Sequence, residues 1–247
     1  MKRTILILSI LSCINIAAAQ DSTQSSQRRN TIKLDLTSYW LYRNALGLSF
    51  ERITKPNQSF VVSLGYQEFP RASTLGSNVV VRENRDRNGY KFGGEYRFYL
   101  RKENKYPAPR GIYLGPYFAY HGFNNERTIE VDNDGTLEEA ILDSKFRIFN
   151  IGFQVGYQFV LNNRWTIDLI FIGPSVSHYK YDLELGGNYT FDKEDIQNEI
   201  ILDLIDRFPV LDEVISDKEA TGSGTLDTWA YGYRYQIHVG YHFGKKR

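Results

Sequence analysis

The sequence predicts an all-β fold, a single antiparallel up-and-down transmembrane β-barrel of eight strands. Three observations lead to this fold class. Apolar and polar residues alternate with a period of two over most of the chain, several of these segments exceed the length of ordinary strands, and short and long connections follow one another in turn.

The N-terminus has the pattern of an export signal. Lys2 and Arg3 precede a short apolar stretch from Thr4 to Ile16, and three alanines end at Ala19. We therefore expect a cleaved signal peptide at 1–19, a flexible polar leader at 20–29 and one barrel domain at 30–247. The chain's one cysteine, Cys13, lies in the signal, so the mature chain is expected to lack disulfides and thiol chemistry.

The composition excludes some classes of partner. The chain has 30 Lys and Arg against 29 Asp and Glu, and without Lys2 and Arg3 the mature charge is about −1. A nucleic-acid partner calls for a strong basic excess, so none is expected. After the signal no run of 18 or more apolar residues exists, which argues against a transmembrane helix. The 18 Tyr and 15 Phe must instead occupy an aromatic surface.

Eight segments alternate as two-faced strands do. In the clearest one, from Trp229 to Phe243, one face is aromatic or aliphatic throughout and the other is small or polar. Pro116 and Pro174 interrupt two segments, where we expect a bulge or a change of register. The eight predicted strands are Ile32–Thr37, Leu46–Arg52, Phe60–Glu68, Tyr90–Leu100, Ile112–Gly122, Arg147–Leu161, Trp165–Tyr179 and Trp229–Phe243.

The connections between these segments alternate in length. Those at 54–58, 101–110 and 162–163 are short, whereas those at 70–88, 124–145 and 180–227 are long. Membrane barrels have tight turns on the periplasmic side and long external loops, and an even number of strands returns both termini to the periplasmic side. The external connection near Ser38–Asn44 is short and is the exception.

Such strands require a closed barrel if they cross a lipid bilayer. Every backbone N–H and C=O group must be paired in hydrocarbon, and only helices and closed barrels satisfy this condition. Eight strands leave an interior that side chains can fill, so we expect the lumen to be plugged rather than open. We also expect Trp40 and Trp229 at external strand ends and Trp165 at a periplasmic end, as parts of aromatic belts.

The polar faces of the strands then point into the lumen. Four acidic and four basic residues lie on them, which is enough for mutual neutralisation in a medium of low dielectric constant. This predicted lumen charge network consists of Lys33, Asp35, Glu51, Lys91, Glu95, Arg97, Asp168 and Arg234.

The signal, the strand set and the end of the last strand together resemble the small outer-membrane β-barrel proteins of Gram-negative bacteria. The closing Gly240–Phe243 has the aromatic-x-aromatic pattern that the barrel assembly machinery reads in such proteins, although here Gly244–Arg247 follow it. The resemblance covers almost the whole mature chain. It implies an outer-membrane location, lipid as surroundings and the assembly machinery as a partner during biogenesis, and it carries over no catalytic residue.

No catalytic or metal site is expected. His238 and His242 share an inward face but lie about 13 Å apart at ordinary strand rise, which is too far for one metal ion. Ser175, Ser177, His178 and Asp168 contain the residue types of a hydrolase, but the neighbours Ser177 and His178 point to opposite faces of a strand. His121 and His178 lack a nearby acidic cluster. We therefore expect neither an enzyme nor a cofactor.

Two features of the expected external loops have alternative interpretations. Glu130, Asp132, Asp134 and Gly135 imitate the start of a calcium loop, but Ile141 occupies the position of its bidentate carboxylate, so a hairpin turned at Asp134–Gly135 is favoured.

The segment Asp192–Ser216 has the spacing of an amphipathic helix. The apolar positions at helical spacing all precede Pro209, which should end or kink the helix. Such a helix would cap the barrel, lie on the membrane surface, meet a partner or pack on its own loop. The following Gly222–Gly224 is a flexible link without the lysine of a phosphate loop. The apolar positions are Ile196, Ile200, Leu204, Ile205 and Phe208.

The leading functional hypothesis is a structural or interaction protein that meets an external partner through loops 124–144 and 181–227. Small-solute transport through a pore, a lipid-modifying outer-membrane enzyme and a soluble ligand-binding barrel are the alternatives.

Overall fold

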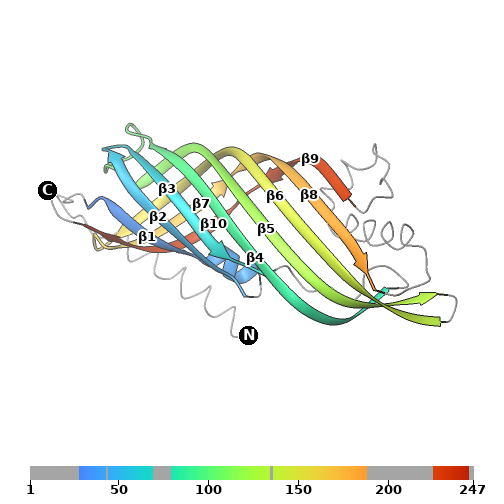
Figure 1. Cartoon of the computed structure of the whole chain (residues 1–247). Helices are drawn as coiled ribbons and strands as arrows, with labels where there is room; N and C mark the ends of the chain where they lie inside the picture. Colours follow the sequence, from blue (N-terminus) through green and yellow to red (C-terminus); the bar gives the residue numbers. More distant parts are fainter. Residues whose placement is uncertain (1–27, 43, 69–78, 134–135, 188–224, 245–247) are drawn as a thin grey trace, which may run out of the picture.

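The computed structural model describes residues 28–42, 44–68, 79–133, 136–187 and 225–244. One antiparallel sheet contains all the strands, and one short helix interrupts them (Figure 1). The elements in chain order are β1 (Asn30–Asp35), α2 (Leu36–Leu41), β2 (Leu46–Lys55), β3 (Gln58–Tyr66), β4 (Val79–Tyr99), β5 (Gly111–Asn133), β6 (Thr136–Leu161), β7 (Trp165–Ile172), β8 (Pro174–Gly186), β9 (Thr225–Tyr233) and β10 (Gln236–Phe243).

The sheet closes into a ring of eight strands, as the sequence predicted. β7 and β8 form one strand that is interrupted at Gly173, because both pair with β6. β9 and β10 likewise form the last strand, which is interrupted at Arg234 and Tyr235. Pairing between β1 and β10, from Asn30–Phe243 to Asp35–His238, closes the ring.

The register fixes how far the strands tilt. Starting at Lys33 and following the paired residues through every strand leads to Ala230, whereas the direct pairing of β1 with β10 joins Lys33 to Gly240. A stagger of this size corresponds to strands that tilt by about 40° to the barrel axis. Consequently, residues at one height come from different positions along successive strands.

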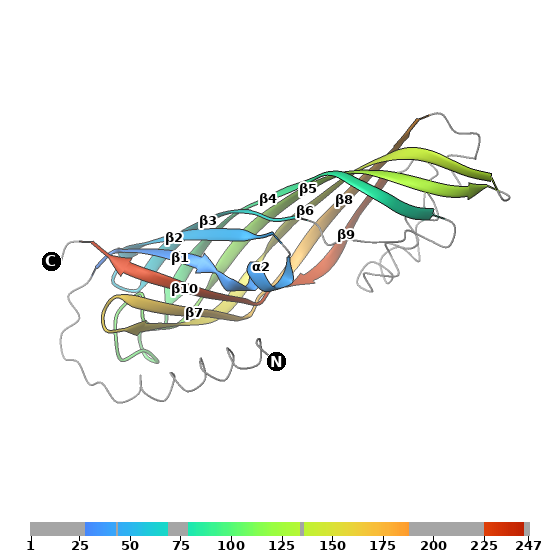
Figure 2. The same cartoon turned by 90° about the horizontal axis from the view of Figure 1, so that it is seen from below.

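Five of the eight strands of the ring continue well beyond the other three. β4, β5, β6, β8 and β9 extend past the end of β1–β2–β3 as a curved sheet, and the start of β1 and the end of β10 lie at the opposite end of the barrel (Figure 2). The connections expected at 70–88, 124–145 and 180–227 were therefore wrong in extent. β5 and β6 pair without interruption from Gly111–Gln158 to Asn133–Thr136, so 124–144 is a strand hairpin rather than a loop.

Two local expectations were also only partly correct. The chain leaves β1 at Leu36 to form α2, whereas the sequence predicted a strand to Thr37, because Asp35 caps the helix by accepting a hydrogen bond from the backbone N–H of Ser38 at 3.1 Å. A register shift does occur next to Pro174, between Val155 and Gly156 of β6. At Pro116 the register of β5 is unchanged, since the proline's missing N–H removes ladder bonds without adding a residue.

Within the barrel, outward side chains are apolar and inward ones are polar. In the extension the outer face is polar and the inner face is largely apolar, although Asn125, Arg127 and Ser144 are also buried on it. On the outside the change falls between Tyr90 and Asp86 on β4, Tyr120 and Asn124 on β5, Phe149 and Arg147 on β6, and Val176 and His178 on β8. On the inside it falls between His121 and Phe123 on β5, Asn150 and Phe146 on β6, and Ser177 and Leu183 on β8. One plane across four strands therefore separates two environments.

Some sequence expectations lie outside the described residues. They are the signal peptide at 1–19, most of the leader at 20–29, the amphipathic helix at 192–216 and the link at 222–224. In the part of the chain that the structure describes, no helix is long and apolar enough to cross a membrane.

Gly115 provides a test of how closely β4 and β5 pack. A Cβ atom at Gly115 would lie 1.8 Å from the carbonyl oxygen of Tyr96, whereas one at Gly186 meets nothing closer than the carbonyl oxygen of Ile141 at 3.9 Å. We expect Gly115→Ala to lower the free energy of unfolding by about 1–3 kcal/mol, because the two backbones must separate. Gly186→Ala is the control and should unfold at the wild-type urea concentration, as followed by electrophoretic mobility without boiling. Equal midpoints for the two variants would contradict the close approach of β4 and β5.

Candidate functional site

All eight residues of the predicted lumen charge network lie on the inner face of the barrel. Seven of them are buried, and the side chain of Arg234 retains 15 % exposure. The structure divides the set into a central cluster of six residues and a separate pair, Asp35 and Lys91. The central cluster consists of Lys33, Glu51, Glu95, Arg97, Asp168 and Arg234.

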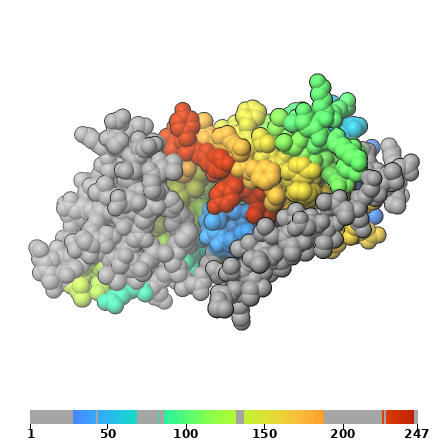
Figure 3. All heavy atoms as spheres, turned by 180° about the vertical axis from the view of Figure 1, so that it is seen from behind, coloured from blue at the N-terminus to red at the C-terminus, as the bar shows by residue number. Residues whose placement is uncertain are grey.

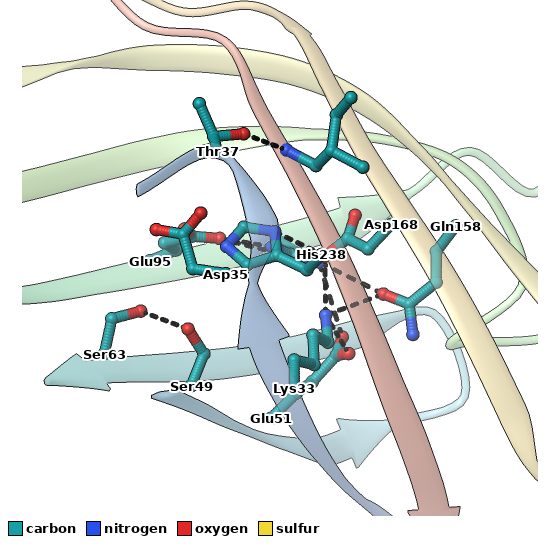
Figure 4. Close-up of polar contacts among 12 residues, drawn as sticks. Lys33, Asp35, Thr37, Ser49, Glu51, Ser63, Glu95, Gln158, Asp168 and His238 are labelled. Atoms are coloured by element: carbon teal, nitrogen blue, oxygen red, sulfur yellow. Dashed lines mark hydrogen bonds and ion pairs between the residues drawn. The ribbon is translucent and has the colours of Figure 1, made fainter. Parts of the chain in front are cut away.

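Asp168 is the centre of this cluster. Its Oδ2 accepts a hydrogen bond from Lys33 Nζ at 2.7 Å (Figure 4). The same oxygen accepts one from Arg97 Nη1 at 2.7 Å, and Oδ1 accepts one from the hydroxyl of Tyr113 at 2.6 Å. The strand tilt brings β1, β4, β5 and β7 to the same height here. A carboxylate with three donors, two of them cationic, remains ionised without contact with water.

Glu51 occupies the side of the cluster formed by β2 and β3. Lys33 Nζ lies 2.7 Å from its Oε2, and its Oε1 accepts hydrogen bonds from Ser59 Oγ at 2.6 Å and Tyr99 OH at 2.8 Å. Gln158 joins the two cations, because its Oε1 accepts hydrogen bonds from Lys33 at 2.8 Å and Arg97 at 3.2 Å. These contacts span the barrel from β1 to β6.

Glu95 connects the two arginines. Its Oε2 accepts hydrogen bonds from Arg97 Nη2 at 2.6 Å and Gln154 Nε2 at 2.8 Å, and its Oε1 accepts one from Arg234. Each guanidinium also lies over an aromatic ring, with Arg97 4.2 Å from the ring centroid of Tyr113. Cation–π contact adds favourable energy to a charge that water does not reach.

The cluster is electrostatically balanced, with three cations and three anions within mutual contact. Burying an isolated charge costs several kcal/mol, and this cost is offset only when partners and hydrogen bonds surround it. Removing one member would therefore leave a buried, uncompensated charge. Ile53, Tyr99, Ala108 and Tyr113 pack together as a buried hydrophobic cluster beside these charges.

The second pair lies higher in the barrel, beneath α2. Lys91 Nζ contacts Asp35 and donates to Ser38 Oγ at 2.6 Å, while Ser38 Oγ donates to Asp35 Oδ2 at 2.6 Å. Asp35 therefore caps α2 and neutralises Lys91 at the same time. This pair fixes the helix to the interior face of β4.

The histidines have partners other than a metal ion. Thr31 Oγ1 lies 2.9 Å from His242 Nδ1, Gln67 Nε2 lies 2.9 Å from His121 Nδ1, and His238 Nδ1 lies 3.9 Å from Asp168 Oδ2. Across the described ranges, no three His, Cys, Asp or Glu side chains are grouped so that they would hold a metal.

The hydrolase residue types are not brought together. Ser177 is buried inside the barrel and donates to Asn150 Oδ1 at 2.6 Å, whereas His178 points outward and lies 2.6 Å from Asp227 Oδ1. Asp168 belongs to the central cluster, and Ser175 Oγ lies 3.2 Å from Ser177 Oγ. The structure therefore places the serine and the histidine on opposite faces of β8.

The residues that imitate a calcium loop lie at the tip of the β5–β6 hairpin. Asn133 pairs with Thr136, which agrees with the favoured hairpin, and Ile141 lies within β6; Asp134 and Gly135 lie outside the described residues. Glu130 instead accepts two hydrogen bonds from Arg82, at 2.6 and 2.7 Å. These bonds hold the pKa of the Glu130 carboxyl below its ordinary value.

Several partners in the central cluster were not singled out from the sequence. Tyr99, Tyr113, Gln154 and Gln158 lie within predicted strands and Ser59 directly precedes one, but the alternation alone assigned none of them a role. The signal that identifies such partners is a polar, inward-facing residue at the same height as the charges. That height is known only once the register between neighbouring strands is known. Of the three tryptophans, Trp165 begins β7 at the end near the termini, Trp40 is on α2 and Trp229 lies within β9.

These features define a class of protein, a closed eight-stranded β-barrel whose interior is filled by balanced, ion-paired side chains. The chain belongs to the DUF3575 family, whose description is a protein of unknown function and whose model matches residues 5–198. No curated protein matches the chain significantly.

Two solved structures show a distant likeness. The N-terminal β-barrel domain of OprF from Pseudomonas aeruginosa is 13% identical, with 88% of this chain and 98% of that chain covered and a TM-score of 0.30. A major outer membrane protein from Thermus thermophilus is 9% identical, with 87% and 98% covered and a TM-score of 0.34. Because TM-scores this low carry no argument about the fold, the evidence for the barrel is the strand pairing within the chain itself.

The balance of the central cluster leads to a stability prediction. We expect Asp168→Asn to lower the free energy of unfolding by about 3 kcal/mol or more, because Lys33 and Arg97 then share two carboxylates instead of three. The matched control is Asp182→Asn, whose partner Arg147 is 43 % exposed, so the loss should stay within about 1 kcal/mol. Urea unfolding in detergent micelles provides the measurement.

A second variant separates charge balance from local packing. Adding Lys33→Met to Asp168→Asn removes one charge of each sign, so the double variant should recover part of the stability that Asp168→Asn loses. If the losses in unfolding free energy of Asp168→Asn and Lys33→Met simply add in the double variant, the cluster is not held by charge balance.

Proposed function

We propose that this protein is an integral outer-membrane β-barrel with a sealed lumen, which holds the extended sheet β4–β5–β6–β8–β9 outside the membrane as a surface for interaction. The reversal of polarity on both faces at one plane is the observation that carries the proposal. The apolar outer surface of the barrel and its ion-paired interior give it further support.

The outer surface of the barrel matches a hydrocarbon environment. Large apolar side chains with substantial exposure surround it, among them Leu64, Phe92, Phe153 and Phe171. Soluble monomers rarely expose a continuous apolar patch of more than a few hundred Å². The belt on β6, from Phe149 to Leu161, spans roughly 30 Å after correction for tilt, which matches the thickness of a bilayer core.

The plane of reversal then corresponds to the outer surface of the membrane. Below it, side chains that point outward meet lipid and those that point inward meet the charged interior. Above it, charged residues such as Arg147, Lys145 and Asp182 point outward, and the buried inner face is largely apolar. A soluble barrel supplies no reason for both faces to change at the same height.

The interior supports an anchoring role rather than conduction. The central cluster crosses the lumen with direct hydrogen bonds, and Ile53 and Ala108 belong to the buried hydrophobic cluster beside it. An ion passing through would have to break several charge-assisted hydrogen bonds, each stronger than a neutral one. The side chains of Ser177 and His178, on opposite faces of β8, offer no support for a lipid-modifying hydrolase.

Cysteine labelling tests the membrane boundary. With Cys13 replaced by serine, single cysteines are introduced at Phe153 in the belt and at Lys145 above the plane of reversal. We expect a membrane-impermeant maleimide to label Lys145→Cys in vesicles and to leave Phe153→Cys unlabelled until detergent is added, because hydrocarbon excludes the reagent. Labelling of both positions without detergent would refute the membrane location, as would recovery of the protein in the soluble fraction.

Planar-bilayer recording tests the sealed lumen. The wild-type protein should give no steady channels, because the central cluster leaves no continuous water path. Replacing both Arg97 and Asp168 by alanine removes one charge of each sign and should produce measurable conductance. Steady, large single-channel currents from the wild type would instead support the pore hypothesis.

A further inference from the structure

The hydrogen-bonded wall of the barrel is interrupted at one place. β1 pairs with β10 only as far as Asp35–His238, after which the chain turns into α2. The last strand continues beyond this point as β9, and among the described residues β9 pairs with β8 alone. Figure 2 shows α2 beside the junction of β10 and β9. We call this interruption between α2 and β9 the seam.

The seam lies at the height of the apolar belt. Tyr231 and Tyr233 on β9 are opposite Val176 and Pro174, which are below the plane of reversal at His178. Tyr231 is 84% exposed and Tyr39 on α2 is 70% exposed, the highest values among the large apolar residues of the described chain. Both sides of the seam thus present aromatic residues where the membrane proposal places the outer leaflet.

Only a small helix closes the seam. α2 has six residues, and Thr37 Oγ1 accepts a hydrogen bond from the backbone N–H of Ile237 at 2.7 Å. Figure 3 shows the blue N-terminal region beside the red last strand on this side of the molecule. Helices this short are marginal on their own, so the seam is weaker than a continuous strand ladder.

The interior behind the seam is less tightly filled than the barrel below it. Inward-facing Ala119, His121 and Asn150 are only half-buried, whereas Tyr117 and Phe123 on β5 and Gln154 and Phe146 on β6 are buried. The Asp35–Lys91 ion pair lies on one side of these residues, and the stacked rings of Phe123 and Phe146, with centroids 6.3 Å apart, lie buried on the side of the extension. A charged pair on one side and aromatic rings on the other fit a molecule that has both a polar group and a hydrocarbon chain.

We propose that the seam is a lateral port through which an amphipathic molecule with a hydrocarbon tail passes between the outer leaflet and the interior above the central cluster. The hydrogen bond that Thr37 Oγ1 accepts from Ile237 N–H holds α2 against the last strand, and we call it the latch bond. This inference rests on the proposed membrane placement and adds a ligand class to it. The central cluster below remains closed, so the path leads from lipid to the interior and not across the membrane.

Fluorescence quenching tests the port. In the Cys13→Ser background, Ala119→Cys is labelled with monobromobimane, and the full chain is reconstituted in phosphatidylcholine vesicles that contain phosphatidylcholine with a nitroxide on its acyl chain. This quencher is confined to the membrane. We expect it to quench the Ala119 label, and Thr37→Val to increase this quenching at least twofold, because the latch bond is lost.

Three controls assign every outcome. Thr54→Val removes a hydroxyl that donates to Gln58 O at 3.3 Å at the opposite end of the barrel and should leave the quenching unchanged. Label at Phe153→Cys reports insertion: quenching there but not at Ala119, with or without Thr37→Val, overturns the port and preserves the membrane placement. No quenching at Phe153 overturns the proposed function itself. An equal rise in quenching by aqueous iodide would indicate general loosening and would also overturn the port.

Discussion

Closure of the backbone hydrogen-bond ring is the constraint on which the rest of this structure depends. A sheet of strands with one apolar face leaves unpaired N–H and C=O groups at its two edges, and pairing of β1 with β10 removes them from the lower barrel. Once the ring is closed at eight strands, the interior is too narrow for bulk water. The polar residues that alternation places inside must then satisfy one another.

The central cluster is the consequence of that enclosure. Asp168, Glu51 and Glu95 each contact at least one cation and accept a hydrogen bond from a neutral donor such as Tyr113, Ser59 or Gln154. Mixed donor sets of this kind use the several lone pairs of a carboxylate more completely than a single ion pair does. The cluster also joins strands distant in sequence, which ties the register of β1 and β2 to that of β4 and β7.

The sequence revealed the barrel well because its strongest signal, the period-two pattern, is the one that a closed barrel with an apolar outer surface and a polar interior requires. It located all eight strands and the inward charges, yet it misplaced the ends of β4, β5 and β6. Beyond Asn124 the alternation persists with reversed polarity, and a criterion that requires an apolar outer face interprets it as a loop. Contacts such as that of Lys33 with Asp168 depend on a stagger that accumulates over eight strands, and no local pattern contains it. The helix α2 was missed because Asp35 was interpreted as an inward charge on a strand and not as the N-cap of a helix.

In the proposed membrane placement, the reversal of polarity at one plane also fixes the depth of the protein along the membrane normal. Sinking by two residues would draw Arg147 and His178 into hydrocarbon, and rising by two would expose Phe149 and Val176 to water. Both displacements raise the free energy, so the barrel occupies a steep-sided minimum in depth. Forces applied to the extended sheet from outside would consequently be transmitted to the bilayer itself rather than absorbed by vertical slippage of the barrel.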